Sequence, residues 1–78
     1  MPARTIQIRQ KDTWLRAVGQ NVREQRKAAK LTQERLAELA ELSPRTVQKI
    51  EAGRLNILVT TLRRLRAGIG CSYHDLLG

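Results

Sequence analysis

The stretch SPRTVQKIEAG (residues 43–53) decides the fold of this chain. Its opening serine can accept a hydrogen bond from a free backbone N–H, and Pro44 has no N–H to leave unpaired, so together they predict a helix start. Its closing glycine suits the left-handed conformation that often ends a helix. Between these limits the larger apolar residues are only Val47 and Ile50. The helix therefore needs one narrow face for a core and leaves its other positions to solvent or a ligand.

A second short helix is expected directly before this one. Thr32 is a good N-cap, and Leu36, Leu39 and Ala40 then recur on one side until the segment ends near residues 41–42. Two short helices joined by a tight turn, the second with little apolar surface, match the physical description of a helix-turn-helix. The second helix of such a pair can enter the major groove of DNA, because only one side of it is needed for the core.

Three further helices complete the prediction, over residues 12–30, 58–67 and 73–77. The first is expected to begin at Asp12 or Thr13, the segment Gly68-Ile69-Gly70 to break the middle one, and Ser72 to cap the last. The apolar side chains expected to face inward from the first and middle helices are Trp14, Leu15, Val18, Val22, Ala29, Val59, Leu62 and Leu65. The sequence thus predicts an all-α fold, a compact five-helix bundle that forms one domain over residues 12–78.

Residues 1–11, MPARTIQIRQK, precede this domain and contain three cations and no acid. Residues 5–9 alternate between polar and apolar with a period of two, which is typical of a short strand, but a lone strand is unstable unless another strand pairs with it. Three interpretations stay open for this basic arm. It is disordered, it lies along DNA, or it forms a strand exchanged across a dimer.

The charge of the chain favours a polyanionic partner. The sequence has 15 Lys and Arg residues against seven Asp and Glu residues, which gives a net charge of +8. A small chain this basic attracts polyanions, and nucleic acid is the commonest of them. Trp14 and Tyr73 are the only aromatic residues. They are too few for the base-stacking surfaces on which single-stranded DNA and RNA are usually bound.

Several classes of protein are disfavoured by composition. Cys71 is the only cysteine and His74 the only histidine, so we expect no disulfide, no zinc site and no catalytic constellation. No apolar stretch reaches the length of a membrane span, and the N-terminus lacks the apolar core of a signal peptide. We therefore expect a cytoplasmic, nucleoid-associated protein that is not an enzyme, uses no cofactor or metal, and has no evident small-molecule effector.

A longer motif starts at Val22 and reads V-x-x-x-R-K-x-x-K-L-T-Q-x-x-L-A-x-x-A-x-L-S-x-x-T-V-x-K-I-E-x-G. It resembles the DNA-binding domain of the Cro and lambda-type repressors, the Xre family of helix-turn-helix regulators. The resemblance continues to the C-terminal end and covers about residues 14–77. One departure is Ile57-Leu58, where many members have Pro-Ser. This change removes a helix cap and adds apolar surface that could serve as a contact.

The resemblance implies a role for each matching residue. The exposed face of the recognition helix, which contacts bases, matches Pro44, Arg45, Thr46, Gln48 and Lys49. Phosphate contacts match Gln33, which also braces the recognition helix, and the loop residues Arg54 and Asn56. A buried or half-buried ion pair between the first and third helices matches Arg26 and Glu51.

Side-chain chemistry agrees with these roles. A guanidinium at Arg45, near the helix N-terminus, can bond the O6 and N7 atoms of guanine together, and Gln48 can pair with N6 and N7 of adenine. Lys49 lies on the same face as Arg45 and can reach a neighbouring base or phosphate. Thr46 offers a hydroxyl to a phosphate or a methyl group to thymine.

The sequence therefore predicts sequence-specific binding of double-stranded DNA by a small transcriptional regulator, expected to be a repressor. The alternative is a protein-interaction adaptor or an antitoxin-type module with the same fold. A phage, restriction–modification, antitoxin or chromosomal setting fits the sequence equally. Because one recognition helix reads only a few base pairs, we expect a homodimer. Its candidate contacts are Ile69, Tyr73, Leu76 and Leu77, which alternatively close the monomer core.

Overall fold

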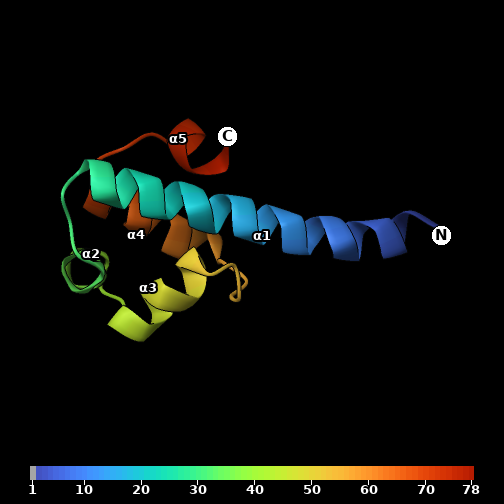
Figure 1. Ribbon diagram of the computed structural model, residues 1–78, viewed down its shortest axis with the longest axis horizontal. Helices are drawn as coiled ribbons and strands as arrows, with labels where there is room; N and C mark the ends of the chain where they lie inside the picture. Colours follow the sequence, from blue (N-terminus) through green and yellow to red (C-terminus); the bar gives the residue numbers. More distant parts are fainter. Residues whose placement is uncertain (1) are drawn as a thin grey trace.

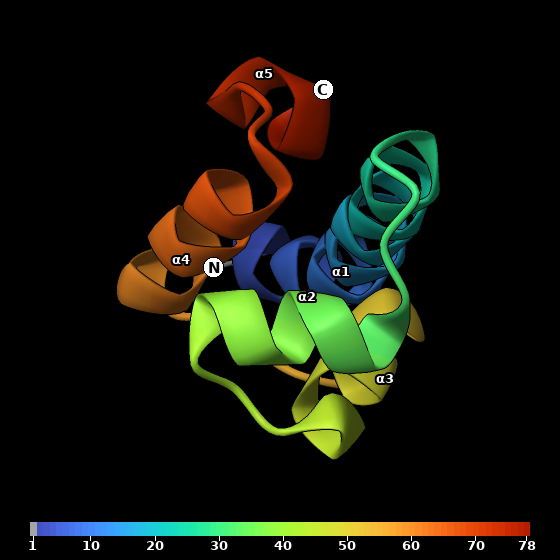
Figure 2. The ribbon, with the colours of Figure 1, turned by 90° about the vertical axis from the view of Figure 1, so that its left-hand side faces the viewer.

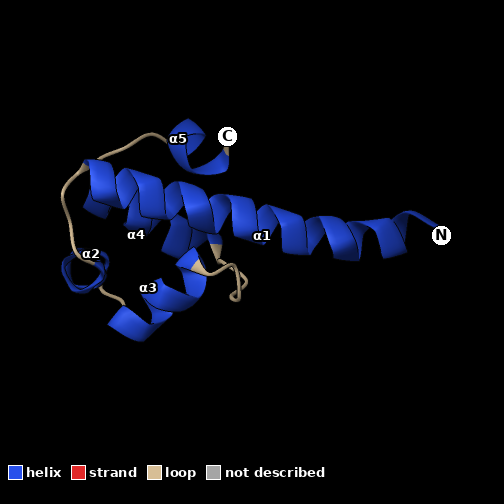
Figure 3. Cartoon of the chain, in the orientation of Figure 1, coloured by secondary structure: helices blue, strands red, loops and turns tan. Residues whose placement is uncertain are grey.

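The computed structural model describes the backbone of residues 2–78 and the side chains of residues 13–78. In this part of the chain the regular structure is entirely helical (Figures 1 and 3). The five helices are α1 (Pro2–Ala28), α2 (Gln33–Ala40), α3 (Pro44–Glu51), α4 (Val59–Ile69) and α5 (Tyr73–Leu77). The predicted all-α, five-helix fold is confirmed. Within residues 2–78 no helix is both long and apolar enough to cross a membrane.

The long helix α1 organises the molecule. Its 27 residues run along the longest dimension, 42 Å, and the four short helices gather around its C-terminal half (Figure 1). Seen along α1, α4 lies beside it, α5 lies above the two, and α2 and α3 lie below (Figure 2). α1 packs against α3, α4 and α5, while α2 packs against α3 and α4.

The core is small, and every helix contributes to it. Its fully buried apolar residues are Val22, Leu36, Ala37, Ala40, Val47, Ile50, Leu65 and Leu76. α3 supplies only Val47 and Ile50, as its sequence predicts. The rest of its surface is therefore free for contacts outside the domain.

Four residues that were expected to face inward are exposed instead. One is Ala29, in the turn that follows α1. Trp14 is 66% exposed on α1, whose N-terminal part projects beyond the other helices (Figure 1). Val59 is 81% exposed and is the first residue of α4, so the core side of that helix begins after it. Leu39 is 42% exposed, and its Cβ lies on the rim where α2 approaches α4 at Gly68.

Two predicted helix boundaries also differ from the structure. α1 begins at Pro2 rather than at Asp12 or Thr13, and residues 2–11 are helical where a strand or disorder was expected. α4 continues through Gly68 to Ile69 and ends at Gly70, whose φ of 81° is left-handed. Within the predicted break segment Gly68-Ile69-Gly70, the helix therefore ends at the second glycine. The missing side chain of Gly68 lets α4 lie close to Leu36.

Local hydrogen bonds define the starts of the short helices. The Thr32 hydroxyl accepts from the backbone N–H of Arg35 at 3.0 Å. Ser72 and Asp75 form a capping box, in which each side chain accepts from the other's backbone N–H at 3.0 Å. Hydrogen bonding to the Asp75 carboxyl, first from the backbone N–H of Ser72 and then from its hydroxyl, holds the pKa of that carboxyl below its ordinary value. Both caps lie where the sequence predicts them.

A close contact between α1 and α3 depends on two glycines. A Cβ added to Gly19 would lie 2.2 Å from the backbone oxygen of Ile50. A Cβ added to Gly53 would lie 2.8 Å from the Cα of Arg16, and the φ of Gly53 is 72°. The backbone of α1 therefore touches the end of α3 with no side chain between them.

Gly19→Ala should lower the melting temperature, by an amount corresponding to about 1–3 kcal/mol of overpacking. The direction of the change in melting temperature is informative. In the absence of a clash, alanine stabilises a helix interior relative to glycine by about 1 kcal/mol, so Gly19→Ala would then raise the melting temperature. Gln20→Ala, at the next and exposed position of α1, is the control and should have little effect. A higher melting temperature for Gly19→Ala in a thermal circular dichroism scan would contradict the close contact.

Candidate nucleic-acid interface

The start of α3 is fixed by Ser43. Its backbone is extended, with φ −78° and ψ 152°, and its hydroxyl accepts from the N–H of Thr46 at 3.1 Å. Pro44 follows as the first helical residue. The hydroxyls of Ser43 and Thr46 also bond each other at 2.9 Å. The Thr46 hydroxyl is therefore engaged locally, and its side chain is half-buried rather than fully exposed.

The end of α3 brings a further cation next to the helix. Gly53 takes the left-handed conformation, and its N–H bonds the oxygen of Ile50 at 3.0 Å. The N–H of Arg54 bonds the oxygen of Lys49 at 2.9 Å. These two bonds reverse the chain immediately after α3. The exposed side chain of Arg54 thus starts beside the last turn of the helix.

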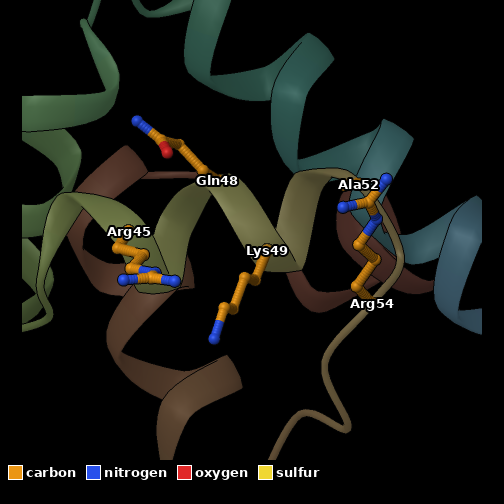
Figure 4. A pocket seen from close by; sticks show the side chains of 5 residues that line it. All are labelled: Arg45, Gln48, Lys49, Ala52 and Arg54. Atoms are coloured by element: carbon orange, nitrogen blue, oxygen red, sulfur yellow. The ribbon is translucent and has the colours of Figure 1, made fainter.

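One face of α3 and the residues after it form an open concavity of about 380 Å³. Its lining contains three cations, one amide and no acid: Arg45, Gln48, Lys49, Ala52 and Arg54 (Figure 4). All five residues are exposed. In Figure 4 the side chains of Gln48 and Lys49 leave α3 in opposite directions. The face therefore offers hydrogen-bond donors across the width of the helix, in a field that attracts anions.

Behind this face lies the ion pair between Arg26 and Glu51. The Nε atom of Arg26 donates to Oε2 of Glu51 at 2.7 Å, and Nη2 donates to Oε1 at 3.1 Å. The two side chains are only 10% and 4% exposed. The pair predicted from the family resemblance is therefore present, in the two-pronged geometry that arginine and a carboxylate favour.

Two further bonds extend the pair into a network. Nη1 of Arg26 donates to the backbone oxygen of Leu31 at 2.8 Å, in the turn after α1. Nε2 of Gln33 donates to Oε1 of Glu51 at 3.1 Å, from the first residue of α2. Glu51 therefore accepts three hydrogen bonds that come from two other helices. Its neighbours hold the end of α3 in one position, and each charge of this pair has its partner.

The remaining residues expected to contact DNA are placed around this face. Pro44 and Asn56 are exposed, the first at the start of α3 and the second in the loop before α4. Gln33 is half-buried, and its amide group braces Glu51, as expected for one of its two roles. The contacts of these residues with bases or phosphates stay predictions.

The candidate dimer residues do not form one patch. Leu76 is fully buried in the core, so the interpretation that it contacts a second chain is wrong; the alternative, closure of the monomer core, holds for it. Ile69 is half-buried against that core. Tyr73 is 43% exposed, and its ring lies 4.9 Å from the guanidinium carbon of Arg66. Only Leu77, 53% exposed, contributes to an apolar groove.

Arg66 is half-buried, although a run of arginines in α4 favours an exposed outer side for it. Its guanidinium group stacks on the Tyr73 ring. The sequence of α4 has three arginines close together, and nothing in this pattern distinguishes the half-buried Arg66 from the exposed Arg63 and Arg64.

Cys71 is also half-buried, and this burial raises the pKa of its thiol, as expected for a small side chain that fills space. Among the described residues, no group of three His, Cys, Asp or Glu side chains could hold a metal ion.

Glu51→Ala should lower the free energy of unfolding by about 3–5 kcal/mol, because it leaves the buried charge of Arg26 without its partner. Glu38→Ala is the matched control, since it removes an exposed pair with Arg35 and should cost at most about 1 kcal/mol. Urea denaturation of both variants measures the difference. Equal losses of stability would contradict the structural role of the buried pair.

Comparison with known proteins agrees with this geometry. The family HTH_3, helix-turn-helix, matches residues 22–76, from the second half of α1 into α5. No curated protein matches the chain significantly. Among solved structures, the restriction-modification controller protein C.AhdI from Aeromonas hydrophila is 32% identical, with a TM-score of 0.77. The alignment covers 80% of this chain and 94% of that one.

A second similar structure is the clp gene regulator ClgR from C. glutamicum. It is 28% identical with a TM-score of 0.78, and the alignment covers 82% of this chain and 83% of that chain. Both similar structures are named for regulatory roles, and the family match includes all of α2, the turn and α3. The chain therefore belongs to the helix-turn-helix family HTH_3 and is a DNA-binding transcriptional regulator.

Proposed function

We propose that this regulator lays α3 in the major groove of double-stranded DNA and reads base edges with Arg45, Gln48 and Lys49. The observation that carries the proposal is the exposed face of α3, which has cations and an amide but no acid. The major groove admits an α-helix, and its base edges present acceptors that arginine, lysine and glutamine can bond. α3 can enter the groove because only two of its side chains belong to the core.

Arg45 is assigned the main contact with guanine. It lies in the first turn of α3, where side chains of a recognition helix reach base edges. Gln48 and Lys49 follow on the same exposed surface and leave the helix in opposite directions, which supports contacts with different base pairs. Pro44 and Thr46 are assigned apolar contacts, since the Thr46 hydroxyl is bonded to Ser43.

Gln33, Arg54 and Asn56 are assigned to the phosphates. The N-terminus of a helix favours anions, and Gln33 is the first residue of α2. Arg54 is exposed beside the last turn of α3. Contacts of this kind supply affinity and orientation without sequence information. The bonds that hold Gln33 to Glu51 and the backbone of Arg54 to Lys49 support a fixed position for both residues relative to α3.

We propose further that the protein is a repressor that acts as a homodimer on two half-sites. We place it in the cytoplasm, bound to the DNA of the nucleoid. A single α3 reads only a few base pairs, and two copies in register double the length of the site. A protein-interaction adaptor is the second candidate. It has no requirement for three cations and an amide on one exposed face, so the charge of this face favours DNA.

Arg45→Ala should relax base preference at one operator position and cost about 1–3 kcal/mol there. Arg54→Ala is the matched variant, because it removes a cation from the same concavity but from a phosphate contact. It should weaken binding by a similar factor on every sequence. Fluorescence anisotropy with operators mutated one base pair at a time separates the two effects. A uniform loss for Arg45→Ala would reassign this residue to the phosphates.

Binding should weaken steeply with salt, with a slope of log affinity against log salt of about −0.9 for each phosphate neutralised. Arg54→Ala should make this slope shallower by about 1, because one phosphate contact is lost. The same anisotropy titration over a series of salt concentrations gives the slopes. An affinity that does not change with salt would favour the adaptor.

A further inference from the structure

A second basic surface lies along α1, outside the concavity on α3. Its four exposed cations are Arg16, Arg23, Lys27 and Lys30. The first three are seven and four residues apart, so they lie on the same side of the helix. Lys30 follows in the turn that ends α1. We call these four residues the α1 stripe.

The α1 stripe borders the end of α3, next to the basic concavity. Gly19 and Arg26 of α1 both contact the end of α3. Arg23 follows the first by four residues and precedes the second by three, so it lies next to both on the helix surface. Arg16 lies against Gly53, because a Cβ added to that glycine would be 2.8 Å from the Cα of Arg16. The concavity includes the residue that follows Gly53, so the α1 stripe continues the basic surface of α3.

The packing of the domain does not account for the charges of the α1 stripe. None of its four side chains forms an ion pair with a residue that the structure describes. Like charges four residues apart, as at Arg23 and Lys27, slightly destabilise a helix. The helix dipole favours cations in the last turn, which includes Lys27 but neither Arg16 nor Arg23. The two arginines therefore carry charge that the domain itself does not use.

We propose that the α1 stripe binds the phosphate backbone of double-stranded DNA beyond the base pairs that α3 reads. This inference rests on the proposed function and adds a second contact surface for the same duplex. From Arg16 to Lys27 the stripe is about 16 Å long, at a rise of about 1.5 Å per residue. A duplex carries about one negative charge per 1.7 Å of its axis, so a stripe of this length can face several phosphates.

The composition of the stripe favours duplex DNA over an acidic protein or a single strand. Protein–protein interfaces have an apolar core inside a polar rim. Between Arg16 and Arg23, on the same side of α1, lies the exposed amide Gln20 instead of an apolar residue. Arginine, lysine and glutamine all bond phosphate oxygens. The stripe also contains no aromatic residue on which unpaired bases could stack.

The length of the duplex should therefore decide how much the α1 stripe contributes. A short duplex of about one helical turn, or about 10–10.5 base pairs, is occupied by the contacts of α3 and leaves few phosphates for the stripe. A long duplex of about three turns supplies phosphates on both sides. Binding to the long duplex should depend more steeply on salt, because more phosphates are neutralised. The flanking sequence should not matter, since phosphate contacts carry no sequence information.

The double variant Arg23→Gln/Lys27→Gln tests the stripe at positions away from Gly53. Glutamine has a helix propensity close to that of arginine and lysine, so the variant should fold. Arg63→Gln/Arg64→Gln is the matched control, because it removes the same charge from the exposed face of α4. Fluorescence anisotropy gives the affinity of each protein for the short and the long duplex over a series of salt concentrations. Both duplexes have the same mixed central sequence.

On the long duplex, Arg23→Gln/Lys27→Gln should make the slope of log affinity against log salt shallower by about 1.8, because two phosphate contacts of about 0.9 each are lost. On the short duplex its slope should match that of the wild type, and the control should match the wild type on both. Gln20→Arg adds a cation within the stripe and should make the slope on the long duplex steeper by about 0.9. This gain tests the inference even if the double variant fails to fold.

The inference is overturned if the folded double variant keeps the wild-type slope on the long duplex, which would leave an acidic protein as the partner of the stripe. An equal change of slope in the control would also overturn it, since net charge alone would then explain the loss. Base preference is measured separately, with the operators used for Arg45→Ala. A wild type without base preference, whose slope on the long duplex still falls in the double variant, would contradict the proposed function and leave this inference intact.

Discussion

The position of the recognition helix depends on one buried carboxylate. Glu51 accepts two hydrogen bonds from Arg26 and one from Gln33, so the last residue of α3 is joined to α1 and to the start of α2. A buried carboxylate that lacks a charged partner destabilises the folded state, and Glu51 has both Arg26 and Gln33 as partners. This network holds α3 where its own apolar contacts, Val47 and Ile50, are few. A helix held mainly from its C-terminal end can keep its exposed face polar.

Close backbone contact between α1 and α3 holds the recognition helix together with the ion pair. Without side chains at Gly19 and Gly53, α1 and the end of α3 meet backbone to backbone. The same left-handed glycine turns the chain so that Arg54 follows directly beside α3. Ser43 fixes the opposite end of the helix through its cap. Both ends of α3 are thus defined by residues that do not face DNA, which separates the structural residues of the motif from those proposed to read bases.

The sequence predicted most accurately where the causes are local. The caps at Thr32 and Ser43 depend on neighbouring residues, so the limits of α2 and α3 follow from short stretches, and the partner of Glu51 followed from a family resemblance. The burial of Trp14, Val59 and Leu76 was predicted less well, because periodicity gives the apolar side of a helix but not where neighbouring helices end. The N-terminal part of α1, which carries the exposed Trp14, projects past its neighbours, and Leu76 of α5 is fully buried in the core.

Selection of bound duplexes from a random pool tests most directly whether α3 reads base sequence. If α3 reads base sequence, the recovered duplexes should share a motif of a few base pairs. With the dimer proposed here, the motif appears twice in inverted orientation, with centres about 10–10.5 base pairs apart. The same selection with Arg45→Ala should lose the preference at one position of each half. Recovered duplexes that share no motif, despite binding that weakens with salt, would contradict the claim.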